Sequence, residues 1–361
     1  MWLKSLELFF RDTLTTHIGR HDPMRISVPT PLFGSRSKVL LLRHDRLGDA
    51  IITLPVLRIL KAHHPNLQID VLLSQYNASM RAHLRRYAQH CWVYEKSPLK
   101  LLSLLRALRK QHYDVIIDPM DNPSATSSLF ITLLGCASIG IEKSNASIYT
   151  HLVPMLERHS VHIIERMAQV LLPFGISPDS NALHLEYPLS QAVIVQGQRR
   201  LGEKLAPYRL GINLSARDPW RYWGRENFIK FIQAFQERTR DVEIILFAAQ
   251  SDAEEARYIG KATATKVAPF VPTLDEFAAM LVQCDFLLTP DTSIVHIAAA
   301  WQVPQVVLYS RVEGLPMVWL PYRAPHFALE TSSESIRAIS VEDVLNAVES
   351  LWKECLLKHS H

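Results

Sequence analysis

The sequence predicts an α/β protein with two domains, each containing a parallel sheet and crossover helices. Short apolar runs of β-forming residues alternate with longer amphipathic stretches, and this rhythm stops and then restarts near residue 205. Size supports the same conclusion. A chain of 361 residues that is 48% hydrophobic exceeds what one compact core usually accommodates.

The first half of the chain reads as successive strand–helix units. Its apolar runs are bounded by polar or turn-forming residues, and the stretches between them have helical spacing. We predict strands at 38–42, 68–73 and 115–118, and helices at 51–63 and 99–111.

The second half repeats this pattern and ends in a helix. We predict strands at 209–214, 242–248, 286–288 and 306–309, and helices at 225–238 and 274–284. From 341 to 357, apolar residues recur at helical spacing, which predicts a C-terminal helix that packs on one domain or bridges both.

Proline and polar residues mark the expected linker between the two halves. Pro173, Pro178 and Pro188 form this linker together with the polar segment 191–200, and we place the boundary between the domains near residues 180–205. We therefore divide the chain into four parts, which are an extension (1–35), a first domain (36–190), a second domain (191–340) and a C-terminal helix (341–361).

Composition argues against several classes of protein. The four cysteines, at 91, 136, 284 and 355, form no CxxC pair and have no ligand-like spacing, so neither a zinc site nor a disulfide framework is expected. The start of the chain is no convincing signal peptide, and no apolar run reaches the roughly 18 residues of a membrane span. We expect a soluble or peripheral protein in a reducing compartment.

Charge is distributed unevenly along the chain. Residues 1–110 hold 18 Lys and Arg against 7 Asp and Glu, whereas the remainder holds 21 against 28. This asymmetry predicts that the first domain meets an anionic partner, either a phosphorylated substrate or a lipid surface, although a well-solvated basic face is the alternative. No nucleic-acid recognition motif accompanies the basic residues, so nucleic acid is not an expected partner.

The first informative motif is RHDRLGD (43–49), which lies between a predicted strand and a predicted helix. Ligands of open α/β sheets bind at this end of a strand. Gly48 permits a tight turn and close backbone approach, and Asp49 stands at the helix start, either as a simple helix cap or as a functional carboxylate. No GxGxxG motif follows, so a dinucleotide cofactor is not supported.

The second motif, TPDTSIVHIAAA (289–300), again joins a strand to a helix. The backbone N–H groups of Thr292 and Ser293 would lie at the helix start, where the helix dipole favours an anion such as a diphosphate. His296 lies one turn after Thr292 and can face the same ligand. The alternative is an ordinary capped helix with a buried histidine.

Together these segments resemble a known family. The resemblance rests on two long segments, VLLLRHDRLGDAIITLPVLRILKAHHPNLQIDVL (39–72) and LLTPDTSIVHIAAAWQVPQVVLY (287–309). It also rests on the shorter segments 162–166, 213–217 and 223–228. In their order they resemble glycosyltransferase family 9, the heptosyltransferase family of lipopolysaccharide core assembly, over roughly residues 37–310. The resemblance implies a GT-B fold, in which two Rossmann-like domains face each other across the active site.

The resemblance also implies roles for individual residues. Asp49 matches the proposed catalytic base of the family, and Gly48 positions the loop before it. Arg221 stands where the family usually has a lysine that contacts the donor phosphates. The implied donor-binding residues are Ser215, Arg221, Glu254, Asp291, Thr292, Ser293 and His296.

An activity follows from the same resemblance. It implies an inverting, metal-independent transfer of a sugar, expected to be heptose, from an ADP-heptose-like donor to a lipopolysaccharide or lipooligosaccharide core acceptor. The first domain would bind this anionic, lipid-linked acceptor and the second the nucleotide-diphosphate sugar. Because the nucleotide sugar is a substrate, no cofactor and no metal are expected. The implied location is cytoplasmic, with peripheral attachment to the inner membrane as an option.

Several departures from the family leave alternatives open. Ser293, the Ser310–Arg311 pair and the segment 248–250 stand where the family usually has glycine. These positions lie where the family binds the donor, so one alternative is a family member that uses a different donor sugar. The other alternative is a non-catalytic GT-B protein that serves in binding or as a scaffold. A nicotinamide-dependent oxidoreductase shares the rhythm but would need the glycine fingerprint.

The N-terminal extension combines apolar and basic residues at near-helical spacing. We expect it to help dock the enzyme on an anionic membrane surface, or to pack as a helix on the first domain. The residues concerned are Trp2, Leu3, Lys4, Leu6, Phe9, Phe10, Arg11, Leu14 and Arg20.

Overall fold

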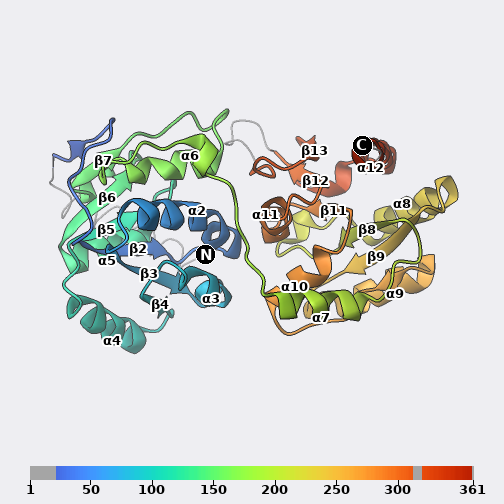
Figure 1. Cartoon of the computed structure of the whole chain (residues 1–361), viewed down its shortest axis with the longest axis horizontal. Helices are drawn as coiled ribbons and strands as arrows, with labels where there is room; N and C mark the ends of the chain where they lie inside the picture. The colour runs from blue at the N-terminus through green and yellow to red at the C-terminus, as the bar shows by residue number, and fades with distance from the viewer. Residues whose placement is uncertain (1–21, 312–318, 360–361) are drawn as a thin grey trace. The chain divides into compact units, whose positions relative to one another are not determined.

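The computed structural model describes residues 22–311 and 319–359. The chain divides into two compact units, Met1–His184 and Leu185–His361 (Figure 1). Each unit is built around its own parallel sheet, which confirms the predicted α/β class. The apolar and basic positions of the N-terminal extension between 2 and 20 lie outside the described residues.

The described part of the first unit contains a seven-stranded sheet in the order β1-β7-β6-β5-β2-β3-β4, and all its strand pairs are parallel. In this arrangement β2 lies between β3 and β5, so the loop that follows β2 emerges from the middle of the sheet. The strands are β1 (Met24–Arg25), β2 (Lys38–Arg43), β3 (Gln68–Ser74), β4 (His90–Tyr94), β5 (Val115–Asp118), β6 (Ala137–Ile141) and β7 (His151–Val153).

Helices cover both faces of this sheet. Leucines of α4 (Pro98–Arg109) and Phe130 of α5 (Ala125–Leu134) join Leu40 and Ile116 of the strands in one buried cluster. A second group of helices contains α2 (Leu47–His63) and the short α6 (Ile163–Met167), which contact each other. The remaining helix, α3 (Arg81–Leu84), precedes β4.

The second unit has, among its described residues, a six-stranded parallel sheet in the order β10-β9-β8-β11-β12-β13. Its central strands β8 and β11 are neighbours, so their carboxyl ends adjoin each other. The strands are β8 (Tyr208–Asn213), β9 (Val242–Phe247), β10 (Lys266–Val267), β11 (Phe286–Pro290), β12 (Gln305–Ser310) and β13 (His326–Thr331).

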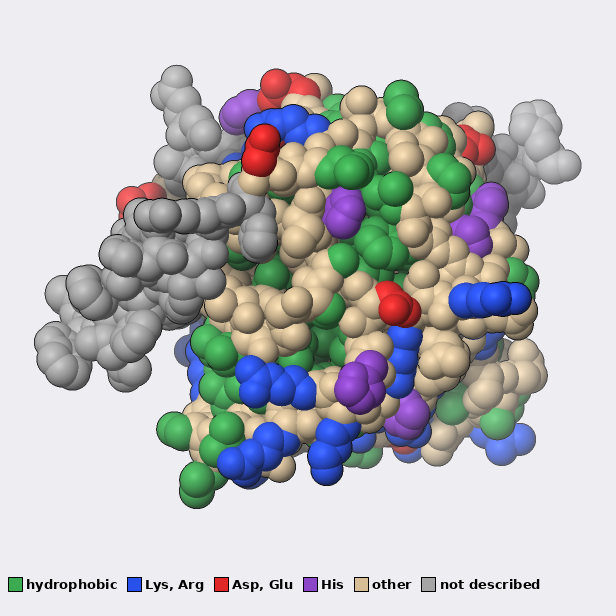
Figure 2. Space-filling model, turned by 90° about the vertical axis from the view of Figure 1, so that its left-hand side faces the viewer, with side chains coloured by type: hydrophobic (Ala, Val, Ile, Leu, Met, Phe, Trp, Pro, Cys, Tyr) green, Lys and Arg blue, Asp and Glu red, His purple; other side chains and the backbone are tan. Residues whose placement is uncertain are grey.

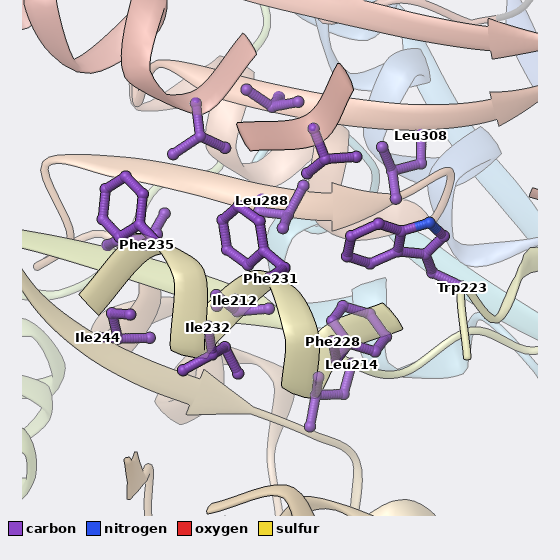
Figure 3. Packing of buried hydrophobic residues seen from close by; sticks show 14 of the residues in the cluster. Ile212, Leu214, Trp223, Phe228, Phe231, Ile232, Phe235, Ile244, Leu288 and Leu308 are labelled. Atoms are coloured by element: carbon purple, nitrogen blue, oxygen red, sulfur yellow. The ribbon is translucent and has the colours of Figure 1, made fainter. Parts of the chain in front are cut away.

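Aromatic residues form the core on one face of this sheet. Phe228, Phe231 and Phe235 of α8 (Arg225–Arg238) recur at helical spacing and point toward the strands (Figure 3). Trp223 lies in the same cluster, is fully buried, and donates its indole N–H to the Ile339 carbonyl at 2.9 Å. The helix α12 (Val341–His359) contacts α8 and strands β11 to β13, so it packs on the second unit.

The polar segment 191–200, predicted as part of the linker, is helical. It lies in the helix α7 (Gln191–Leu201). The Ser190 side chain caps this helix by accepting the Val193 N–H at 3.3 Å. Gly197 and Leu201 are buried at helical spacing, and α7 packs against α10 (Leu274–Leu281). The exposed Gln198 and Arg199 between them obscured this spacing in the sequence.

The remaining helices complete the layers of the second unit. They are α9 (Ala253–Thr263), beside α8, and α11 (Ser293–Ala300), beside α10. Among all the helices in the described ranges, none has the length and apolar character needed to cross a bilayer.

Candidate active site

The side chain of Arg43, at the end of β2, is buried and organises the turn into α2. Its Nε donates to the Asp49 carbonyl at 2.9 Å, and its terminal nitrogens lie 3.3 Å from the Asp45 carboxylate and 3.6 Å from that of Asp49. The Asn77 amide holds the turn from the neighbouring loop by donating to the carbonyls of Arg43, at 2.7 Å, and Arg46, at 3.3 Å. One guanidinium therefore serves two carboxylates.

Asp49 is the third residue of α2, and its carboxylate points back along the helix. Its Oδ2 accepts the Arg46 N–H at 3.0 Å, as in a capping box. The alternative that Asp49 is the N-cap is wrong, because Leu47 and Gly48 are already helical and Arg46 is the cap. The side chain is 11% exposed, so part of the carboxylate remains accessible.

Gly48 does not form the tight turn that the sequence predicted. It is a buried residue in the first turn of α2, and its φ angle is not among the positive values found in the chain. The helix begins four residues before the predicted start at 51, since the loop is fixed by Arg43 and Asn77 rather than by a glycine turn.

Burial shifts two pKa values beside this turn. It raises the pKa of the Asp45 carboxyl from 3.8 to about 7, against the opposing effect of the Arg43 guanidinium. Burial also lowers the pKa of the His44 imidazole to about 4, although the Asp118 carboxylate acts in the other direction. At neutral pH the imidazole is therefore uncharged, and Asp45 keeps its proton to a higher pH than an ordinary carboxyl does.

A buried ion pair lies at the end of β5. The Lys143 ammonium is 3.0 Å from the Asp118 carboxylate, which also accepts the Tyr149 hydroxyl at 2.5 Å. Burial acts to raise the pKa of Asp118, but the Lys143 charge and the two hydrogen bonds outweigh it and hold this pKa below its usual value. Because Lys143 also donates to the Met120 carbonyl, the pair anchors the loops after β5 and β6.

The segment 162–166 anchors the same region. The His162 side chain accepts the Ile164 N–H at 3.3 Å and so caps α6. Arg166 forms an ion pair with Asp121 at 2.8 Å and donates to the Val161 carbonyl at the same distance. These contacts hold the loop after β5 in place, and they assign this segment a structural role.

In the second unit, Arg221 lies in a 3₁₀ turn, Pro219–Arg221, that follows β8. Its Nη1 donates to the Asp291 carbonyl at 2.8 Å and lies 3.0 Å from the Asp291 carboxylate. The pair joins the loop after β8 to the loop after β11. The Arg221 side chain is 29% exposed, so the guanidinium retains donors that face solvent.

The loop after β11 leads into α11, whose N-cap is Thr292. The Thr292 hydroxyl accepts the Ile294 N–H at 3.3 Å. The Asn213 amide donates to the hydroxyls of Thr289, at 3.0 Å, and Thr292, at 3.4 Å. Ser293 is the first helical residue of α11, and Arg221 bonds to Asp291 two residues before it. The Arg221 guanidinium therefore lies in the loops that also contain the positive end of the α11 dipole.

Ser215 connects this network to the loop after β9. Its hydroxyl donates to the Asp252 carboxylate and accepts the Ala249 N–H at 2.8 Å. Its carbonyl and N–H are both bonded to the Asn213 side chain. Because these partners occupy the Ser215 hydroxyl, the residue fixes the carboxyl ends of β8 and β9.

His296 is buried within α11, one turn after Thr292, with only 3% of its surface exposed. Its ring lies 6.1 Å, between centroids, from that of Trp319. The imidazole is thus buried one turn behind the N-cap of α11.

Of the acidic pair at 254 and 255, Glu255 rather than Glu254 lies in a cavity. Glu255 is bonded to Tyr222 and to the Arg225 guanidinium, and with Asp252 it lines a cavity of about 860 Å³. Glu254 is exposed and is not among the lining residues. The structure therefore does not bring Glu254 to the network of Arg221 and Asp291, and its donor contact stays a prediction.

Three hydrogen bonds tie the Arg221 loop and the first turn of α8, which follows it, to the segment 335–339. The Ser335 hydroxyl donates to the Trp220 carbonyl at 3.3 Å, and the Asn227 amide donates to the Arg337 carbonyl at 3.3 Å. The third is the bond from the buried Trp223 indole to this segment. The loop is therefore supported by residues more than a hundred positions further along the chain.

The described residues thus form two clusters. One in the first unit contains Asp49 with Gly48, and one in the second contains Ser215, Arg221, Asp291, Thr292, Ser293 and, behind them, His296. Arg43, Asp45, Asn77 and Asn213 were not predicted as site residues. Their signal was their position at or just after strand ends. Within the described ranges, no three His, Cys, Asp or Glu side chains group as metal ligands.

A comparison with known families decides what kind of protein this is. The model of glycosyltransferase family 9 (heptosyltransferase) matches residues 101–327, more than half of the chain. The chain belongs to glycosyltransferase family 9. This membership confirms that it is a glycosyltransferase of the heptosyltransferase type, and it excludes the oxidoreductase alternative. The Arg43–Asp49 turn lies before the matched segment.

Individual relatives of family 9 extend the likeness over most of the chain. Lipopolysaccharide heptosyltransferase 3 of Escherichia coli (strain K12) is 25% identical over 344 residues, which cover 85% of this chain and 96% of that protein. The solved structure of a family 9 glycosyl transferase from Veillonella parvula has a TM-score of 0.72 at 20% identity, over 89% of this chain and 98% of the other. That of E. coli ADP-heptose lps heptosyltransferase II has a TM-score of 0.66 at 18% identity, over 89% and 99%. These structures confirm the GT-B fold class.

Proposed function

We propose that this family 9 enzyme transfers heptose from ADP-heptose to the core of a lipopolysaccharide or lipooligosaccharide acceptor. The acceptor class comes from the likeness to a lipopolysaccharide heptosyltransferase, and the donor from the name of the solved relative with an ADP-heptose substrate. The observation that carries the proposal is the pairing of Arg221 with the start of α11, because a diphosphate needs both a cation and helix N–H donors.

In the proposed reaction the acceptor hydroxyl attacks the anomeric carbon of the donor. A new bond forms between the acceptor oxygen and this carbon, the bond to the diphosphate breaks, and its electron pair leaves with ADP. Asp49 takes the proton of the acceptor hydroxyl, which is general-base catalysis worth about 10²–10⁴-fold. Attack from the side opposite the leaving group inverts the anomeric configuration.

The charge that develops on the leaving diphosphate needs stabilisation. Arg221, whose exposed guanidinium donors can bind phosphate oxygens, would supply it together with the α11 N-terminus. Asp291 orients the guanidinium through its carbonyl and carboxylate, so no reorganisation is needed during the reaction. We propose that these groups act without a bound metal or cofactor.

The proposal is tested with purified enzyme and a core acceptor that lacks one heptose. ADP release and the mass of the product identify the transfer, and NMR of the new linkage determines whether the anomeric configuration has inverted. We expect transfer from ADP-heptose that persists with excess EDTA. Transfer from another nucleotide sugar only would replace the donor assignment. Loss of activity in EDTA that returns with Mg²⁺ would contradict the metal-free mechanism, and absence of all transfer would favour a binding or scaffold protein.

A further inference from the structure

Helix α4 of the first unit exposes leucines that its own domain does not cover. Its inner face, with Leu105 and Leu108, is buried against the sheet. On the outer face Leu99 is 81% exposed and Leu102 is 46% exposed. Neighbouring aliphatic side chains that are as exposed as Leu99 are typical of interaction surfaces when charged residues surround them.

The charged residues around these leucines are almost all basic. Between 95 and 110 the chain carries five Lys and Arg residues and one acidic residue, Glu95, which is paired with Lys100. Leu99, Leu102 and Arg106 recur at helical spacing, so their side chains lie along the same exposed face of α4. This face is apolar near the start of the helix and basic near its end. Figure 2 shows Lys and Arg side chains gathered along the lower edge of this side of the molecule, with hydrophobic side chains projecting beside them.

This combination determines the kind of partner. The positive charge repels a second copy of the same surface and attracts an anionic one. Single-stranded nucleic acid is typically bound by aromatic side chains on which bases stack, whereas the large exposed hydrophobic residues of α4 are leucines. Aliphatic side chains flanked by Lys and Arg are typical of helices that lie in the interface of a bilayer with anionic lipids.

We propose that the outer face of α4, with Leu99, Leu102, Lys100 and Arg106, docks the enzyme on an anionic lipid bilayer together with Lys96 and Lys110 at the two ends of the helix. The two leucines enter the interface between headgroups and acyl chains, and the basic side chains bind lipid phosphates. This docking surface belongs to the folded first domain and does not require the N-terminal extension. It would bring the domain proposed to bind the acceptor to the surface in which a lipid-linked acceptor is embedded.

The test uses the full-length chain and flotation with two kinds of vesicle, phosphatidylglycerol–phosphatidylethanolamine and pure phosphatidylcholine. We expect the protein to bind the anionic vesicles and to dissociate as salt rises. The double variant Leu99→Ser with Leu102→Ser should lower the partition coefficient roughly tenfold or more, because two apolar side chains lose their burial in lipid. The matched control is Leu205→Ser, since Leu205 is equally open at 83% exposure but lies in the second unit.

A charge variant tests the electrostatic part. Arg106→Glu with Lys110→Glu should weaken binding at least about fivefold for each cation lost, whereas Lys230→Glu with Lys261→Glu, on exposed helix positions of the second unit, should not. Unchanged binding of the leucine variant, an equal loss in the Leu205→Ser control, or failure of the unaltered protein to bind anionic vesicles would each overturn the proposal.

An activity assay separates this inference from the proposed function. The leucine variant should transfer sugar to a water-soluble, delipidated acceptor at the parent rate and should be slower only on an acceptor embedded in vesicles. An equal loss of rate on both acceptors would contradict docking. If neither protein transfers sugar to any acceptor, the proposed function fails, while vesicle binding still decides the role of α4.

Discussion

At the scale of single residues, the Asp49 carboxylate has a structural contact and a proposed chemical role that one substitution separates. In Asp49→Asn the side-chain oxygen can still accept the Arg46 N–H. The variant loses the ion pair with Arg43 at 3.6 Å, but Asp45 still pairs with this guanidinium at 3.3 Å, so thermal stability should remain almost unchanged. The proton acceptor is lost, and turnover should fall roughly 10²-fold or more with little change in donor affinity. Steady-state kinetics on the core acceptor measure this, with differential scanning calorimetry for stability.

Asp49→Ala is the matched comparison. It removes the hydrogen bond to Arg46 as well, so it should lose about 0.5–2 kcal/mol of stability in addition to activity. Near-normal turnover of the Asn variant would refute the role of Asp49 as a base and leave it only a structural one.

The charge of Arg221 can be tested on nucleotide binding alone. Arg221→Ala should weaken the binding of ADP by about 1.5–3 kcal/mol, because a charge-assisted contact to phosphate is lost. Isothermal titration calorimetry measures the dissociation constant. Arg238→Ala is the control, since Arg238 pairs with Glu342 and Glu349 on the surface of the same unit. An unchanged ADP affinity in Arg221→Ala would remove this residue from the donor site.

Asp45 should make stability depend on pH. Its pKa is raised from 3.8 to about 7 by burial, so the folded protein keeps a proton that the unfolded chain releases. The free energy of unfolding should therefore fall as pH rises from about 4 toward 7, by up to about 1.4 kcal/mol per pH unit. Asp45→Asn removes this loss and should stabilise the protein more at pH 8 than at pH 5 in urea titrations. The control Asp22→Asn, at an exposed carboxyl, should show no such pH-dependent stabilisation. A stability difference for Asp45→Asn that does not change with pH would contradict the raised pKa of Asp45.

At the scale of elements, the packing of α7 on α10 depends on a residue without a side chain. A Cβ added at Gly197 would lie 2.5 Å from the backbone of Ala279, which cannot move without shifting α10. Gly197→Ala should therefore destabilise the second unit by about 1–3 kcal/mol. Thermal unfolding followed by circular dichroism measures this. Gly34→Ala is the control, because its added Cβ would meet nothing closer than 3.9 Å, and equal melting temperatures for both variants would contradict close packing.

The sequence predicted seven of the thirteen strands in the described residues, and it missed β1, β4, β6, β7, β10 and β13. The continuous apolar runs of β2, β5 and β11 identified buried parallel strands directly. The helix α7 was missed because two buried residues, Gly197 and Leu201, are weak signals among exposed polar ones. The start of α2 was missed because Arg46 is not a usual cap, and the bonds that fix it come from the distant Asn77.

The sequence predicted where several residues of the candidate site lie along the chain, but it did not predict which of them contact each other. Asp49 and Thr292 stand at strand–helix junctions that the sequence makes visible. The pairing of Arg221 with Asp291 joins residues 70 positions apart, and it depends on β8 and β11 being neighbours in the sheet. A single sequence gives no strand order, so the donors and acceptors around Arg43 and Arg221 could not be derived from it.

At the scale of the whole molecule, the two units should respond to different substrates. Hydrogen–deuterium exchange on the full chain should show that ADP protects peptides covering 213–222 and 289–296, where the Arg221 network lies. A core acceptor without donor should instead protect peptides around 43–49. AMP in the same buffer serves as the control, because a monophosphate lacks the second phosphate. Protection by ADP confined to 43–49 would contradict the proposed division of roles.

The support of the Arg221 loop by residues 335–339 has a consequence for biosynthesis. A ribosome releases the chain from its N-terminus, so residues 219–223 emerge long before the segment whose hydrogen bonds hold them. Until that segment has left the exit tunnel, the Trp223 indole lacks its acceptor at Ile339, and the Trp220 carbonyl lacks the Ser335 hydroxyl. A nascent chain therefore cannot complete the support of the Arg221 loop, and if this loop binds the donor as proposed, donor binding should arise only when translation of this protein is nearly finished.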